Sequence, residues 1–287
     1  MPPTLSFPRK REPNRARLRR LWAPAFAGMT LLGCSPQPPI APGKIISNNP
    51  CIDAVLAEIA DPVSIGAISR FSQDAESGSA PLDWAQQFPA IGFSAEEIIA
   101  AKPRLVLSGN YASTGTNAAL RKAGIRVESF GVPATLEASK TQVLGIARAI
   151  GREAEGAALV ARMEQATRPQ SGIETAVIWQ TGGFVAGQGT IQDEMLARAG
   201  FRNASSTYGL KQWDMLPLET ILRNPPDVIF TPVSAKGDDA RALALRQRVL
   251  RHLKGRTRTV AFPDRLLFCG GPTVIAAMQA MRSGRNP

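Results

Sequence analysis

One pattern of residues occurs twice in this sequence, in segments that start more than a hundred residues apart. The copies span residues 94–107 and 217–230, and each has a glutamate near its start, Glu96 in the first and Glu219 in the second. Each copy predicts a short helix, a proline that ends it, and a buried apolar strand, because proline forces the preceding residue into an extended conformation. The repetition favours two similar α/β lobes, and two lobes form a cleft in which a ligand can bind.

The positive charge of the chain is unevenly distributed. The sequence has 287 residues, enough for two modest lobes, and a formal net charge of +11. Residues 1–34 contain seven arginines and lysines and one glutamate, whereas the remaining excess of positive charge is scattered without a run. Scattered basic residues are typical of a solvated surface, so we predict no nucleic-acid partner.

The first 34 residues have the organisation of a signal peptide for export. A basic stretch is followed by the apolar segment 21–32, which is too short to span a bilayer, and then by Leu-Leu-Gly-Cys at 31–34. This tetrapeptide resembles the lipobox of bacterial lipoproteins, whose cysteine becomes the lipidated N-terminus. We therefore predict a lipid anchor on Cys34 and a proline-rich tether over 35–43. A chance cysteine in an apolar leader is the alternative.

The number of cysteines is consistent with export. If Cys34 is lipidated, Cys51 and Cys269 remain as an even pair, each near the start of a predicted helix. In an oxidising compartment such a pair can form a disulfide. The sequence does not give the Cα separation that the bond requires, so a disulfide and two buried free thiols both stay open.

Predicted strands and helices alternate from residue 44 onward, which is typical of mostly parallel sheets. We expect an N-terminal lobe over 44–134 and a C-terminal lobe over 169–287. Between them, residues 135–168 follow a helical pattern without proline and predict one long connecting helix. Glycines weaken this pattern, and Gly151 is the point at which the helix could break in two.

The residue types offer no catalytic constellation. The single histidine, His252, falls in a basic amphipathic helix, so neither a cluster of imidazole metal ligands nor a Ser-His-Asp triad is supported. The Gly-Gln-Gly segment at 187–189 is a lone pattern, for which a tight turn is the main interpretation and an amide cradle for an anion the other. We therefore predict a binding protein rather than an enzyme, without a cofactor or metal site of its own.

Several motifs occur in the order found in one family of receptors. They are Asn-Pro-Cys-Ile-Asp at 49–53, the repeat at 96–107, the long helical pattern, Gly-Gln-Gly-Thr at 187–190, the segment 212–226 and Cys-Gly-Gly-Pro at 269–272. In this order, residues 44–281 resemble the substrate-binding proteins of ABC importers for cobalamin, ferric siderophores and haem. The resemblance implies an α/β fold with two Rossmann-like lobes of mostly parallel sheet, joined by one long interdomain helix in the class III periplasmic-binding-protein clamshell.

The resemblance also implies a function. A periplasmic, membrane-anchored monomer would capture a metal chelate between the lobes and deliver it to a permease dimer with its ATPase. The chelate itself would bring the cobalt or iron. A corrinoid such as cobalamin is placed ahead of a ferric siderophore or haem, because an anionic catecholate would require a cluster of arginines and the expected cleft loops contain few. An exported α/β enzyme with an interlobe active site and a non-transport ligand sensor on the same fold are the alternatives.

The ligand is expected against loops at the carboxyl ends of the strands. The residues predicted to bind it are Asn49, Trp84, Asn110, Tyr111, Phe184, Gln188, Trp213 and Gly271. Trp84, Tyr111 and Trp213 are preferred because a macrocycle favours aromatic faces, and core packing is the alternative for each. The resemblance further implies that Glu96 and Glu219 dock on the permease, whereas stabilisation of a helix N-terminus is the other interpretation.

Overall fold

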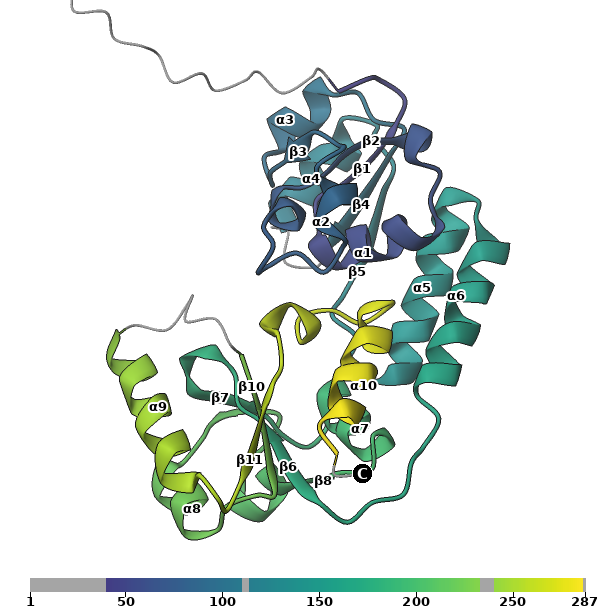
Figure 1. The fold of residues 1–287 in the computed structure, drawn as a ribbon. Coiled ribbons are helices and arrows are strands. Elements are labelled where there is room, and N and C mark those ends of the chain that lie inside the picture. Colours follow the sequence, from purple (N-terminus) through teal and green to yellow (C-terminus); the bar gives the residue numbers. More distant parts are fainter. Residues whose placement is uncertain (1–39, 110–113, 233–239, 286–287) are drawn as a thin grey trace, which may run out of the picture. The chain divides into compact units, whose positions relative to one another are not determined.

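The computed structural model describes residues 40–109, 114–232 and 240–285 (Figure 1). All of them belong to one compact unit, Gln37–Pro287. Within these ranges, none of the helices combines the length and the apolar character needed to cross a membrane. Cys34 with its predicted signal peptide lies outside the described residues, and so do Asn110 and Tyr111.

The N-terminal half is built on one parallel sheet with the strand order β3-β2-β1-β4-β5. The three central strands are buried along their whole length, which explains why they read as continuous apolar runs in the sequence. The strands are β1 (Ile45–Ser47), β2 (Ile65–Ser69), β3 (Ala90–Ile91), β4 (Leu105–Gly109) and β5 (Val127–Phe130), and the helices are α1 (Pro50–Ile59), α2 (Leu82–Ala85), α3 (Ala95–Ala100) and α4 (Thr114–Lys122).

The C-terminal half contains a second parallel sheet, with the order β11-β10-β6-β8, and an antiparallel ribbon of β7 and β9. The strands are β6 (Thr175–Ile178), β7 (Phe184–Ala186), β8 (Arg202–Asn203), β9 (Trp213–Met215), β10 (Val228–Thr231) and β11 (Arg258–Ala261), and the helices are α7 (Ile191–Arg198), α8 (Leu218–Arg223), α9 (Ala240–Leu253) and α10 (Thr273–Ser283). Two separate mostly parallel sheets confirm the predicted fold class.

The two copies of the repeated pattern lie in different halves. The first forms α3 and β4 of the N-terminal sheet, and the second forms α8 and β10 of the C-terminal sheet. In both copies the apolar residue two positions after the glutamate, Ile98 or Ile221, is completely buried. The helix therefore packs on its sheet through the same position in each half, and the glutamate before it is left on the outer side.

The connector differs from the prediction of one long helix over 135–168. It consists of two helices that run side by side, α5 (Leu136–Ile150) and α6 (Glu153–Ala166) (Figure 1). Gly151 ends α5 in the left-handed conformation, with φ of 74°, and the chain reverses there. Gly156 lets the helices approach closely, because a Cβ at this position would overlap the Cβ of Ala147.

Both connector helices belong to the same hydrophobic core as the two halves. Val143 of α5 and Met163 of α6 are buried in one continuous cluster with Leu56 of α1 and Met278 of α10. In addition, the backbone amide of Leu136 at the start of α5 donates to the Glu194 carboxylate of α7 at 2.8 Å. Since α5 and α6 pack against helices of both halves, the connector resists independent motion of either half.

Candidate functional site

A cavity of about 590 Å³ lies where loops of the two halves meet, within the size range of small-molecule sites. The N-terminal half supplies Asn48, Asn49, Pro50, Cys51, Phe71, Phe93 and Gly109, and the segment before α5 supplies Val132, Pro133 and Ala134. The C-terminal half supplies Gly189, Thr190, Ile191, Gln192, Gln212, Trp213, Leu267 and Phe268. As the crevice rule predicts, several of these residues directly follow strands, such as Asn48 after β1 and Gly109 at the end of β4.

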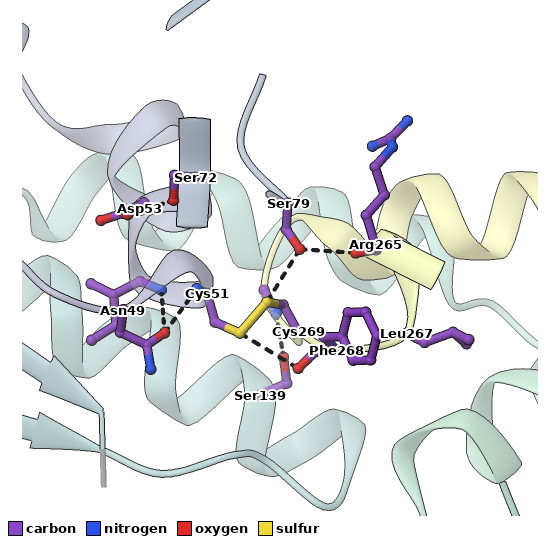
Figure 2. Close-up of a disulfide and its surroundings, with 12 residues drawn as sticks. Asn49, Cys51, Asp53, Ser72, Ser79, Ser139, Arg265, Leu267, Phe268 and Cys269 are labelled. Carbon is purple, nitrogen blue, oxygen red and sulfur yellow. Dashed lines mark hydrogen bonds between the residues drawn. A yellow bond between two sulfur atoms is a disulfide. The ribbon is translucent and has the colours of Figure 1, made fainter. Parts of the chain in front are cut away.

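Asn49, which lines the cavity, is the N-cap residue of α1. Its side-chain Oδ1 accepts hydrogen bonds from the backbone amides of Cys51 at 2.8 Å and Ile52 at 3.2 Å, which caps α1 (Figure 2). Pro50 follows at the first helical position, where its missing N–H costs nothing. The Asn49 amide nitrogen packs against Gly109, where any Cβ would overlap it. The close approach of these two loops sets the floor of the cavity.

The neighbouring Asn48 is placed differently. Its side chain is buried, with 1% of its surface exposed, and neither Nδ2 nor Oδ1 has a hydrogen-bond partner among the described residues. From the other half, Gln192 donates through Nε2 to the Leu267 carbonyl oxygen at 2.6 Å, while its Oε1 has no partner in the described part of the chain. Buried polar atoms are normally satisfied, and these unpaired amide atoms have almost no accessible surface, so they can bond to a bound molecule only if their side chains turn towards the cavity.

Exposed aromatic rings form much of the remaining wall. Phe71 and Phe93 contact each other with ring centroids 5.9 Å apart, and Trp213 and Phe268 come from the other half. Between 43% and 51% of the surface of each of these four side chains is exposed. Large apolar faces that are gathered around a cavity rather than packed in the core indicate a binding surface for a flat or apolar ligand.

The described residues that line the cavity are uncharged. None of the described lining residues carries a formal charge at pH 7. In the described ranges, no three His, Cys, Asp or Glu side chains come close enough to hold a metal ion. His252 lies exposed on α9 and is absent from the lining. The described lining therefore offers a molecule in the cavity apolar contact, aromatic stacking and neutral hydrogen bonds.

A buried carboxyl group lies directly behind this wall. Asp53 of α1 has no exposed surface and accepts hydrogen bonds from the Ser72 hydroxyl at 2.6 Å and the Ser69 backbone amide at 2.9 Å (Figure 2). Burial raises the pKa of Asp53 to about 7, although hydrogen bonds from Ser47, Ser72 and Ser69 act in the opposite direction. Asp53 thereby ties α1 to the end of β2 and fixes the helix that carries Asn49.

Cys51 and Cys269 are joined by a disulfide, so the structure contains the first of the two alternatives that the sequence left open (Figure 2). The S–S distance is 2.08 Å and the Cα atoms lie 5.1 Å apart. Cys51 belongs to the first turn of α1, and Cys269 belongs to the loop that precedes α10. The bond therefore links the N-terminal half covalently to the last segment of the C-terminal half.

The predicted ligand residues fall into several groups. Asn49 and Trp213 line the cavity. Gln188 is not part of the lining, although Gly189 and Thr190 directly after it are. Gly271 lies behind the wall, where its backbone amide donates to the Ser139 hydroxyl at 2.7 Å.

Two predicted aromatic residues lie away from the cavity. Trp84 packs on Phe88, with ring centroids 4.8 Å apart, against the hydrophobic core, so core packing accounts for its position. Phe184 pairs with Met215 across the β7–β9 ribbon and is not part of the lining. Asn110 and Tyr111 fall outside the described residues. Phe71, Phe93 and Phe268 were not selected from the sequence, because an aromatic residue in a loop carries no local signal of its exposure.

The two repeated glutamates occupy matching positions. Glu96 lies in the first turn of α3 and Glu219 in the first turn of α8, and both are exposed. Neither helix has a side-chain hydrogen bond at its N-cap, so a carboxylate in the first turn stabilises the exposed amides there. Glu97, next to Glu96, is also exposed, and its carboxylate accepts a hydrogen bond from the Gly92 backbone amide at 3.1 Å.

Comparison with known proteins adds three findings. The model of the periplasmic binding protein family matches residues 45–254. A cobalamin-binding protein of Halobacterium salinarum is 27% identical over 213 residues, which are 71% of this chain and 58% of that protein. The chain thus spans little more than half the length of this curated relative.

Solved structures share the fold at low sequence identity. The heme-binding protein HutB of Vibrio cholerae superposes with a TM-score of 0.70 at 17% identity, covering 85% of this chain and 99% of that one. The apo form of the heme-binding protein RhuT from Roseiflexus sp. RS-1 superposes with a TM-score of 0.66 at 22% identity, again covering 85% and 99%. At this identity the likeness shows a common fold.

Proposed function

The chain belongs to the periplasmic binding protein family, and from this premise we propose that it is the substrate-binding component of an ABC importer for a corrinoid. It captures the metal chelate between its two halves and delivers it to a permease dimer with an attached ATPase. The cobalamin-binding relative supports the choice of ligand, and the fold shared with heme-binding proteins supports the choice of class.

One observation carries the choice of a corrinoid: the described lining of the cavity is aromatic and amide-bearing, and it is uncharged. Haem carries two propionates, and ferric catecholates are strongly anionic, so both favour arginines or lysines around them. Cyanocobalamin has no net charge, and carboxamides surround its ring. Carboxamides can pair with side-chain amide atoms that lack a partner among the described residues, such as those of Asn48 and the Oε1 of Gln192, once these turn towards the cavity.

In this proposal, different residues of the lining contribute different contacts to the ligand. Phe71, Phe93, Trp213 and Phe268 offer stacking surface, while Asn48 and Gln192 offer hydrogen bonds from opposite halves. Tyr111 and Asn110 stay in the proposal because they follow Gly109, which lines the cavity. Asn49 contributes its amide nitrogen and fixes the floor.

The remaining parts of the proposal concern delivery. Glu96 and Glu219 are exposed at equivalent positions of the two halves, which suits docking on a permease of two matching subunits. Cys34 provides the lipid anchor that keeps a monomeric receptor at the membrane surface in the periplasm. Among the described residues, the uncharged lining and the exposed position of His252 give no support to the enzyme alternative.

A comparison of two aromatic variants tests the proposed ligand site. Trp213→Ala removes a ring from the cavity, whereas Phe184→Ala removes an equally exposed ring outside it. We expect cyanocobalamin to raise the melting temperature of the wild type and of Phe184→Ala, and to bind Trp213→Ala at least tenfold more weakly. Equal binding by both variants, measured by calorimetry, would contradict the assignment of this cavity.

A further inference from the structure

We propose that the Cys51–Cys269 disulfide is a redox-sensitive clasp on the ligand cavity: a bound ligand shields the bond from reduction, and reduction weakens ligand binding. The inference concerns the regulation of the proposed ligand site and rests on it. The disulfide joins residues separated by 218 positions and links α1 to the loop before α10 (Figure 2).

The bond forms part of the cavity wall. Cys51 lines the cavity and is half-buried, whereas only 3% of the surface of Cys269 is exposed. Leu267 and Phe268, directly before Cys269, line the cavity as well. A reductant therefore reaches the bond at Cys51, from the space that a ligand would fill.

The polar contacts that hold residues 265–271, the loop that carries Cys269, to the rest of the protein are neutral hydrogen bonds. The Gln192 side chain donates to the Leu267 carbonyl oxygen at 2.6 Å, and the Gly271 amide donates to the Ser139 hydroxyl at 2.7 Å. The Ser79 hydroxyl lies 2.8 Å from the Arg265 carbonyl oxygen and 3.2 Å from Cys269 Sγ (Figure 2). Leu266 and Leu267 anchor the start of this segment in the hydrophobic core, whereas Phe268 is exposed, so without the disulfide its place in the wall depends on its neighbours and on these neutral hydrogen bonds.

The surroundings favour cleavage by a dithiol. One thiolate of the dithiol attacks Cys51 Sγ, the S–S bond breaks, and Cys269 leaves as a thiolate, towards which Ser79 can turn its proton. The second thiol of the reagent then displaces Cys51, which leaves as a thiolate in the first turn of α1, where the helix dipole stabilises negative charge. Two electrons pass to the protein, both cysteines take up protons, and the reagent becomes a cyclic disulfide.

Protection of the disulfide by the ligand and weaker ligand binding after reduction are thermodynamically linked. If the oxidised protein binds the ligand more tightly than the reduced protein does, the ligand must stabilise the oxidised state by the same factor. Occupation of the cavity also blocks the approach to Cys51. A receptor with this clasp would hold its ligand in an oxidising compartment and release it more readily where dithiols are present.

The first experiment measures both directions of this linkage. It uses the full chain with Cys34→Ser, so that Cys51 and Cys269 are the remaining thiols. Dithiothreitol should release thiols at least tenfold more slowly when cyanocobalamin saturates the protein. The Cys51→Ser/Cys269→Ser variant in the same background should bind cyanocobalamin about tenfold more weakly. A reduction rate that is independent of bound cyanocobalamin overturns the proposal.

The second experiment needs no ligand, so it separates failure of the clasp from failure of the corrinoid assignment. Hydrogen exchange of the amides over 267–271 should become at least tenfold faster in the Cys51→Ser/Cys269→Ser variant, while exchange in β4 stays unchanged. Unchanged exchange at 267–271 overturns the clasp even if cyanocobalamin binds. Faster exchange without any cyanocobalamin binding supports the clasp and rejects the proposed ligand.

Discussion

Removal of the disulfide should lower the free energy of unfolding by about 5 kcal/mol. The estimate follows from the 218-residue separation of Cys51 and Cys269, because a cross-link over so long a segment strongly restricts the unfolded chain. A folded unit of about 250 residues unfolds with an entropy of roughly 0.5 kcal/mol/K. The melting temperature of the Cys51→Ser/Cys269→Ser variant should therefore fall by about 10 °C.

Scanning calorimetry of the full chain in the Cys34→Ser background provides the measurement. Dithiothreitol should lower the melting temperature of the disulfide-bonded protein to that of the variant, and it should leave the variant itself unchanged. A decrease of less than about 2 °C on removal of both cysteines would refute the reasoning, because the bond would then restrict neither state appreciably. A further decrease of the variant in dithiothreitol would show that the reagent acts elsewhere.

Three further predictions concern the connector, the buried carboxyl and the repeated glutamates. Gly156→Val should force α5 from α6 at Ala147 and lower the melting temperature by about 2–6 °C, and an unchanged melt would argue against the tight helix pair. Asp53 keeps its proton up to about pH 7 in the folded state, against an ordinary pKa of 3.8, so stability should fall by a few kcal/mol as the pH rises from about 4 to 7. Asp53→Asn should flatten this dependence in urea titrations, and a slope equal to that of the wild type would contradict the assignment. Glu96→Ala/Glu219→Ala should leave cyanocobalamin affinity unchanged and lower the melting temperature by only about 1–4 °C, through the two helix N-termini, but abolish stimulation of the reconstituted transporter's ATPase; retained stimulation would exclude docking through these carboxylates.

The fold could be predicted because its signals are local and repeated. The two Glu-helix-Pro-strand segments carry enough information to place β4 and β10 in separate sheets. Their strands are buried throughout, so a continuous apolar run identifies them without any knowledge of their neighbours. Ile98 and Ile221 show that even the buried side of each helix follows the same register.

The connector could not be predicted in the same way. Apolar residues continue with helical spacing on both sides of Gly151, so periodicity does not distinguish one straight helix from two antiparallel ones. The difference lies in a left-handed residue at Gly151 and in the small residue at Gly156 that permits close packing. Two glycines at this spacing within a helical pattern are consistent with a helical hairpin.

The site was harder to predict because it depends on which loop side chains are exposed, and the local sequence of a loop does not determine this. Trp84 and Phe71 both lie in polar stretches, yet the first packs on the core and the second lines the cavity. Asn48 and Asn49 are adjacent amides, but capping of α1 uses Asn49 and leaves Asn48 without a partner among the described residues. Only the packing of distant segments decides between these outcomes.

The described lining of the cavity is uncharged and bears amides, and we propose that it selects a neutral corrinoid. Calorimetric titration of the full chain with cyanocobalamin, haemin and a ferric catecholate in parallel tests it most directly. Cyanocobalamin should bind with one-to-one stoichiometry and at least a hundredfold more tightly than either anionic chelate. Preferential binding of haemin or the catecholate, or no binding of cyanocobalamin, would contradict the claim.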